Sequence, residues 1–125
     1  MINDSGIRVE KAVNVNQILW DAKNKVAAGC IVSEDLGVDD GEGHKIAKAG
    51  TPVKGDLENR SEPFTAASGA DVTGVLQHDV DVTRGSNNGS ALIFGFVDLN
   101  KLEADVVAKI TDDIKANLPM VKFLR

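Results

Sequence analysis

Two neighbouring stretches constrain the fold more than any other part of the sequence. Residues 72–82 place Val72, Leu76, Val80 and Val82 at strand spacing, and residues 91–97 are almost wholly apolar. Period-two spacing predicts a strand, and a short apolar run between turn signals predicts a buried one. The connection contains Asn87-Asn88-Gly89, which suits a turn. The pair therefore predicts a sheet with residues 91–97 at its centre.

Other short strands are expected around this pair. Gly50 and Pro52 predict a tight turn after the strand that begins at Lys45, and Pro52 argues against a central strand there. Phe64 and the Ala66-Ala67 pair are expected to point inward from a long polar loop. The remaining predicted elements are a strand at 28–33, an acidic hairpin turn at 34–43, the loop at 55–70 and a terminal strand at 120–125.

A helix is predicted over residues 101–117. Leu102, Val106, Ile110, Ile114 and Leu118 recur every four residues, and Pro119 follows them. Asn100 stands at the capping position, with Glu103 where a capping box needs it. A short helix or turn is predicted over residues 16–27.

These elements predict a β-rich α+β fold with a small sheet or barrel. The 125 residues suffice for one domain. We expect an N-terminal arm over residues 1–15, because its apolar residues alternate without an apolar partner nearby, and a single domain over 16–125.

Composition limits the function classes. The formal charge of −5 and the scattered basic residues argue against nucleic-acid binding. The single cysteine, Cys30, lies in an apolar stretch and is expected to be a buried, inert thiol. No stretch is typical of a membrane span or a signal peptide, so synthesis in a cytoplasm is expected.

One dense cluster contains residue types used in catalysis: His78, Asp79 and Asp81. On a strand, His78 would point away from both carboxylates unless the strand ends there. We therefore expect the carboxylates to cap turn N–H groups, and we predict no catalytic residue, metal site or cofactor. A small enzyme or metal protein using this trio is the less favoured reading.

Three segments carry a family resemblance when taken in order. They are Ile-Ala-Lys-Ala-Gly-Thr-Pro-Val at 46–53, Val-Thr-Gly-Val-Leu-Gln-His-Asp-Val-Asp-Val-Thr at 72–83, and Ala-Leu-Ile-Phe-Gly-Phe-Val-Asp-Leu-Asn-Lys-Leu at 91–102. Together they resemble the small head-decoration proteins of tailed bacteriophages, the group that includes the lambda-type capsid-stabilising protein.

The resemblance implies a β-tulip-like domain that acts as a homotrimer at three-fold and quasi-three-fold positions of an icosahedral capsid. There it would clamp the major capsid protein after expansion, on the outer surface of the virion. The implied capsid contacts fall in the arm, at Ile7, Val9, Val13 and Val15, with Trp20 as a further anchor. The alternative is a phage fibre-base or glycan-binding module on a similar fold.

Overall fold

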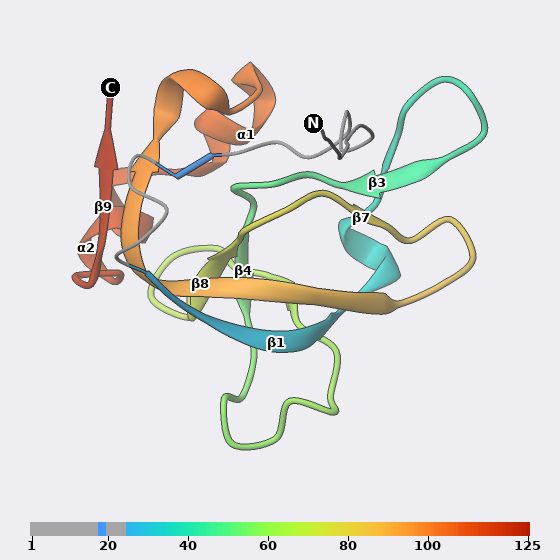
Figure 1. Ribbon diagram of the computed structural model, residues 1–125, viewed down its shortest axis with the longest axis horizontal. Helices are drawn as coiled ribbons and strands as arrows, with labels where there is room; N and C mark the ends of the chain where they lie inside the picture. Colours follow the sequence, from blue (N-terminus) through green and yellow to red (C-terminus); the bar gives the residue numbers. More distant parts are fainter. Residues whose placement is uncertain (1–17, 20–24) are drawn as a thin grey trace, which may run out of the picture.

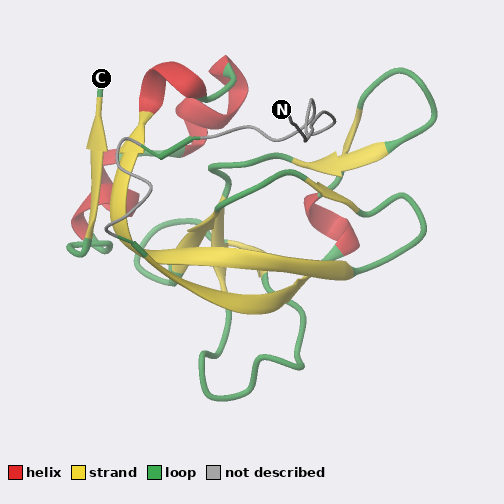
Figure 2. Cartoon of the chain, in the orientation of Figure 1, coloured by secondary structure: helices red, strands yellow, loops and turns green. Residues whose placement is uncertain are grey.

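Strands make up most of the regular structure in the computed structural model, which describes residues 18–19 and 25–125. Two short α-helices and short 3-10 turns complete it (Figures 1 and 2). The strands are β1 (Val26–Val32), β2 (Val38–Asp39), β3 (Lys45–Ala47), β4 (Pro52–Lys54), β5 (Thr65–Ala66), β6 (Gly74–Leu76), β7 (Val80–Asp81), β8 (Asn87–Asp98) and β9 (Val121–Leu124). The helical elements are η2 (Glu34–Leu36), η3 (Leu99–Lys101), α1 (Ala104–Lys109) and α2 (Asp112–Ala116).

Strand β8 is central to the larger sheet, as the sequence predicts. Its partners are β1 and β6, both antiparallel, and β9, which runs parallel to it. The six-stranded sheet continues from β6 through β4 to β5. Figure 1 shows β8 bending strongly along its length, and Gly95 within it has a φ of +151°. A residue without a Cβ suits this bend.

A smaller sheet, in the order β2-β3-β7, accompanies the larger one. One buried cluster includes Val32, Leu76 and Val80, and so joins both sheets. The other includes Leu92 and Val97 of β8, Ile110 just after α1, Ile114 of α2 and Val121 of β9. The predicted β-rich α+β class is confirmed, and no closed barrel forms among the strands that the structure describes.

The predicted helix over 101–117 is wrong as a single element. The chain forms η3, α1 and α2 instead, with Ile110 at a non-helical ψ of 81°. The break has a local cause, because the Thr111 hydroxyl accepts a hydrogen bond from the Ile114 N–H and starts a new helix. Asp98 rather than Asn100 caps η3, and Glu103 makes no side-chain cap. The predicted apolar row is nevertheless buried at Val106, Ile110, Ile114 and Leu118.

The predicted strand over 72–82 is also divided. Gln77–Asp79 separate β6 from β7, which belong to different sheets. The predicted turn at Asn87-Asn88-Gly89 is wrong, because these residues begin β8. The turn lies before these residues in the chain, at Gly85, which has a φ of +126°.

Several smaller predictions have mixed outcomes. Phe64 is fully buried, whereas Ala66 is exposed. Gly50 has the positive φ that its turn requires, but Pro52 belongs to β4, which has a neighbour on each side. Proline is tolerated there because it is the first residue of the strand. The strands predicted at 28–33 and 120–125 are confirmed as β1 and β9.

The predicted helix over 16–27 is wrong at its C-terminal end, where Val26 and Ala27 belong to β1. A β-bridge pairs Leu19 with Val97. Residues 16–17 and 20–24, and the arm over 1–15, lie outside the described residues.

Close packing between β1, β7 and β8 leads to a stability prediction. A Cβ on Gly89 would lie 2.6 Å from Val32 Cγ2 and 2.9 Å from Val80 Cγ2. We expect Gly89→Ala to lower the free energy of unfolding by about 1–3 kcal/mol through overpacking, measured by urea denaturation. Gly29→Ala is the matched control, because a Cβ there meets nothing within 4 Å. Equal stability of the two variants would contradict the packing argument.

Candidate functional site

His78, Asp79 and Asp81 lie where the chain leaves the larger sheet, in the segment that leads from β6 through β7. All three side chains are exposed, at and beyond the point where β6 ends. The Asp79 carboxylate accepts a hydrogen bond from the Ala49 N–H at 2.7 Å, and that of Asp81 accepts one from the Thr83 N–H at 2.9 Å. The predicted role as a cap of the following turn is therefore confirmed for Asp81, whereas Asp79 caps an N–H group in a different turn, the one at Ala49.

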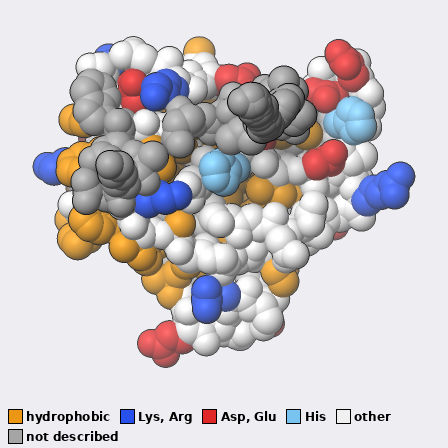
Figure 3. Space-filling view, in the orientation of Figure 1, with side chains coloured by type: hydrophobic (Ala, Val, Ile, Leu, Met, Phe, Trp, Pro, Cys, Tyr) orange, Lys and Arg blue, Asp and Glu red, His pale blue; other side chains and the backbone are white. Residues whose placement is uncertain are grey.

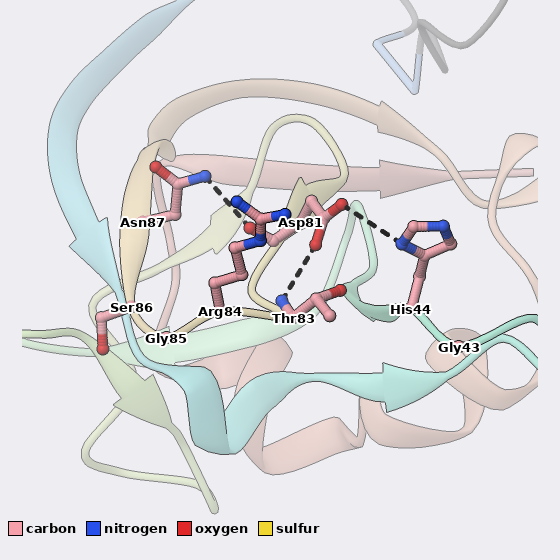
Figure 4. A pocket seen from close by; sticks show the side chains of 8 residues that line it. All are labelled: Gly43, His44, Asp81, Thr83, Arg84, Gly85, Ser86 and Asn87. Atoms are coloured by element: carbon pink, nitrogen blue, oxygen red, sulfur yellow. Dashed lines mark hydrogen bonds and ion pairs between the residues drawn. The ribbon is translucent and has the colours of Figure 1, made fainter.

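Asp81 takes part in a different polar site, an open groove between the β2–β3 hairpin loop and the β7–β8 turn (Figure 4). His44 Nδ1 lies 3.8 Å from Asp81 Oδ2. The groove has a volume of about 680 Å³. Its lining residues are Gly43, His44, Asp81, Thr83, Arg84, Gly85, Ser86 and Asn87.

Sheet register explains why His44 meets Asp81. Ile46 pairs with Asp81 in the β3–β7 ladder, and the Lys45 N–H donates to the Thr83 hydroxyl at 2.8 Å. The hairpin loop is thereby held against the turn that follows β7. Sequence reasoning missed this pairing because residues far apart in the chain meet only through the sheet.

The electrostatics of the groove centre on the Asp81 carboxylate. Hydrogen bonds from Thr83 lower the pKa of Asp81 most, and the nearby His44 and Arg84 lower this pKa further. Asn87 Nδ2 donates to the Asp81 carbonyl oxygen at 3.0 Å, so the turn is fixed from both of its ends. The ionised carboxylate thus acts as a structural acceptor.

The groove has little that supports catalysis. His44, Asp81, Arg84 and Ser86 are exposed, whereas catalytic electrostatics depend on groups shielded from water. Ser86 Oγ accepts a hydrogen bond from the Glu34 N–H at 3.3 Å, so it too acts as an acceptor for the backbone. Within residues 18–19 and 25–125, no group of three or more His, Cys, Asp and Glu residues is arranged to hold a metal ion.

Cys30 is buried, as predicted. Its side chain belongs to the cluster between the sheets, and burial raises the pKa of the thiol, although Arg60 opposes this shift. A raised pKa reduces the thiolate fraction at neutral pH, so nucleophilic reactivity is reduced. No helix among the described residues is long and apolar enough to cross a membrane.

The residues expected to contact a capsid, Ile7, Val9, Val13, Val15 and Trp20, lie outside the described residues. The three segments that carry the family resemblance can be followed in full. Residues of β4 pair with β6, β6 pairs with β8, and β3 pairs with β7. The segments therefore form one connected part of the two sheets.

Comparison with known proteins adds no family assignment, because no protein-family model matches the chain and no curated protein matches it significantly.

The groove leads to a pH prediction. Because the folded-state pKa of Asp81 is lowered, its carboxylate stabilises the fold above the ordinary aspartate range of about 3.9. This stabilisation is lost as pH falls through the folded-state pKa. Asp81→Asn removes the charge but keeps an acceptor oxygen for Thr83. We expect the free energy of unfolding to fall less in this variant than in the parent between about pH 6 and about pH 2.5, measured by urea denaturation.

Asp35→Asn is the control for this experiment. Asp35 is also an exposed aspartate in a turn, and no hydrogen bond to its carboxylate is present among the described residues. This variant should keep the pH dependence of the parent. An Asp81→Asn variant with the parent's pH dependence would show that the Asp81 charge does not stabilise the groove.

Proposed function

We propose that this chain is a structural virion protein of a tailed bacteriophage, one that binds the outside of an icosahedral capsid and stabilises it. It acts as a homotrimer at three-fold and quasi-three-fold positions and contacts the expanded major capsid protein. A β-tulip-like architecture with an extended N-terminal arm is part of the proposal.

The observation that carries the proposal is the connectivity of the three resembling segments. The "Ala-Gly-Thr-Pro" turn precedes β4, which pairs with β6 through Pro52 and Val75. Val75 in turn pairs with Leu92, within the apolar run of β8. Segments that match a family in order and spacing, and that also form one connected sheet region, support a shared framework better than isolated motifs do.

The proposed mechanism needs no catalysis. A protein that binds one form of a shell more tightly than another stabilises that form by its differential affinity. Many copies on one shell add their binding free energies. The groove side chains His44, Asp81, Arg84 and Ser86 are exposed, and those of Asp81 and Ser86 accept hydrogen bonds from backbone N–H groups, which is consistent with a binding protein.

The arm is proposed to contact the capsid by strand addition. Ile7 and Val9 alternate with polar residues, as do Val13 and Val15, and this spacing suits an extended peptide that pairs with a sheet edge. Trp20 is proposed as an apolar anchor beside it.

A glycan-binding module is the competing function. The groove offers it Asp81, Arg84 and Asn87 as polar contacts. Its lining residues include no Trp, Tyr or Phe on which a sugar ring could stack. The capsid proposal is therefore preferred, and the experiment below separates the two.

The direct test is sedimentation of the purified protein with empty shells of the phage that encodes it. We expect co-sedimentation with expanded shells and none with unexpanded shells, because the proposed clamp recognises the mature surface. Absence of binding to both would contradict the proposal. Binding to host-cell glycans without binding to shells would favour the competing function.

Deletion of residues 1–15 tests the role of the arm. We expect weaker binding to expanded shells, with the same thermal unfolding temperature as the full chain, because the proposed arm is separate from the proposed domain over residues 16–125. Thermal unfolding of the free protein is the control. A large fall in its unfolding temperature would show that the arm is part of the folded domain.

A further inference from the structure

Strand β1 lies at the edge of the larger sheet, and β8 is its one ladder partner among the described strands. In an antiparallel pair, alternate residues direct both their N–H and their C=O groups toward the same side of the strand. The carbonyl groups of Gly29 and Ile31 make contacts away from β8, so these residues face outward. By the same alternation, Ala27 also faces outward. We call the outward backbone groups of these three residues the β1 edge.

An edge of this kind can pair with a strand of another molecule, because its N–H and C=O groups lack a strand partner. The sequence of β1, Val-Ala-Ala-Gly-Cys-Ile-Val, contains no charged residue and no proline, which favours such pairing. Ala27 and Gly29 are exposed, and a Cβ on Gly29 would meet nothing within 4 Å. The backbone is therefore accessible in the middle of the strand.

The two ends of β1 are protected by the fold itself. At the C-terminal end, the Phe64 N–H donates to the Ile31 carbonyl oxygen at 2.7 Å, and the Ser33 N–H donates to the Phe64 carbonyl oxygen at 3.0 Å. At the N-terminal end, the register with β8 shifts between the first two residues of β1. Such irregularities twist an edge away from regular pairing. The middle of the edge, at Gly29, needs another kind of protection.

Arg60 covers the middle of the edge. Its Nη1 donates to the Gly29 carbonyl oxygen at 3.2 Å, although the two residues are 31 positions apart in the sequence. Arg60 is also the one charged residue among those that line an open pocket of about 260 Å³ beside Gly29. A strand that pairs with the β1 edge would have to displace this guanidinium.

The loop that carries Arg60 is fixed at its base and within its turns. Gly55 packs so closely against the ring of the buried Phe64 that a Cβ there would overlap the ring. Within the loop, the Asn59 N–H donates to the Asp56 carbonyl oxygen at 3.1 Å. Figure 1 shows this loop extending past β1 on the side away from β8. Arg60 therefore reaches the edge from a loop of defined shape.

We infer that Arg60 protects the β1 edge and prevents it from pairing with the β1 edge of a second copy of this chain. Its guanidinium occupies the outward carbonyl group that neither the Phe64 contact nor the irregular start of the strand protects. Removal of this side chain would leave room for a second β1 strand. The inference goes beyond the proposed function and does not depend on it.

Charge repulsion between copies is a different explanation, and it makes the opposite prediction. The loop contains Asp56, Glu58 and Glu62 besides Arg60, and the whole chain has a formal charge of −5. Loss of Arg60 makes both the loop and the chain more negative, so repulsion would increase and association would fall. The protective role predicts that association rises. The direction of the change therefore separates the two explanations.

The test compares self-association of the parent and of Arg60→Ala by sedimentation velocity over a range of concentrations. A reductant is present, so that Cys30 cannot cross-link the copies. We expect the association constant of Arg60→Ala to be about tenfold or more above that of the parent, because the exposed edge can form hydrogen bonds with a second copy. Parent-like association of this variant would overturn the inference.

Arg84→Ala is the matched control. Arg84 is an exposed arginine in the turn before β8, its loss changes the charge equally, and it does not line the pocket beside Gly29. This variant should associate as the parent does. A rise equal to that of Arg60→Ala would show that the effect is not specific to the β1 edge and would overturn the inference.

A second substitution locates the contact. Gly29→Pro removes an N–H group from the β1 edge, and proline is tolerated on an edge strand where its nitrogen faces solvent. The φ of Gly29 lies outside the left-handed region, so the strand conformation is open to proline. Combined with Arg60→Ala, this substitution should return association to the parent level. Gly29→Ala keeps the N–H group and should not; equal effects of the two would contradict pairing through the β1 edge.

Amide exchange of Arg60→Ala gives a readout that does not depend on tolerance of proline. The N–H groups of Ala27 and Gly29 should exchange more slowly at high concentration than at low concentration, because pairing supplies them with acceptors. Circular dichroism should show every variant folded. Unchanged exchange of these two groups in an associated sample would overturn the inference.

Discussion

Backbone pairing of β8 is the constraint on which the rest of the structure depends. This strand has β1 along one edge, β6 and then β9 along the other, and Leu19 bridged to Val97. Its side chains enter both buried clusters, since Ala91 belongs to one and Leu92 to the other. Because a strand inside a sheet satisfies its backbone groups on both edges, an apolar strand can be buried at this position at low cost. The bend at Gly95 then directs the second half of β8 toward β9.

The acidic composition has a structural role in the turns. The carboxylates of Asp39, Asp71, Asp81 and Asp98 each accept a hydrogen bond from a backbone N–H within three residues along the chain. Such bonds favour the ionised form, and they are the main reason why the pKa of Asp71 is lowered. The pKa of Asp81 is lowered first by the hydrogen bond from the Thr83 hydroxyl and next by the one from the Thr83 N–H. The many short strands require many turns, and aspartate satisfies the N–H groups that these turns leave unpaired. Part of the negative charge is therefore a consequence of the fold rather than a sign of what the protein binds.

Sequence reasoning succeeded where a pattern is local and failed where distant residues decide. The apolar run of β8 and the terminal strand β9 follow from side-chain alternation alone. The helical row was correct in its buried positions, but Thr111 capped a new helix that periodicity does not reveal. Likewise, the carboxylate of Asp81 was predicted to cap a turn, whereas its approach to His44 depends on the β3–β7 register. The exposure of Val26 could not be predicted, because the sequence does not show which part of β1 the smaller sheet covers.

The polar groove and the exposed apolar side chains of Val26 and Met120 differ in what they could contribute to binding. Polar groups in the open groove are already hydrated, so a ligand there would exchange one set of hydrogen bonds for another with little net gain. Removing Val26, Phe94 and Met120 from water is favourable in proportion to the apolar area buried. A few side chains contribute less than the roughly 800 Å² per partner of a stable two-protein interface.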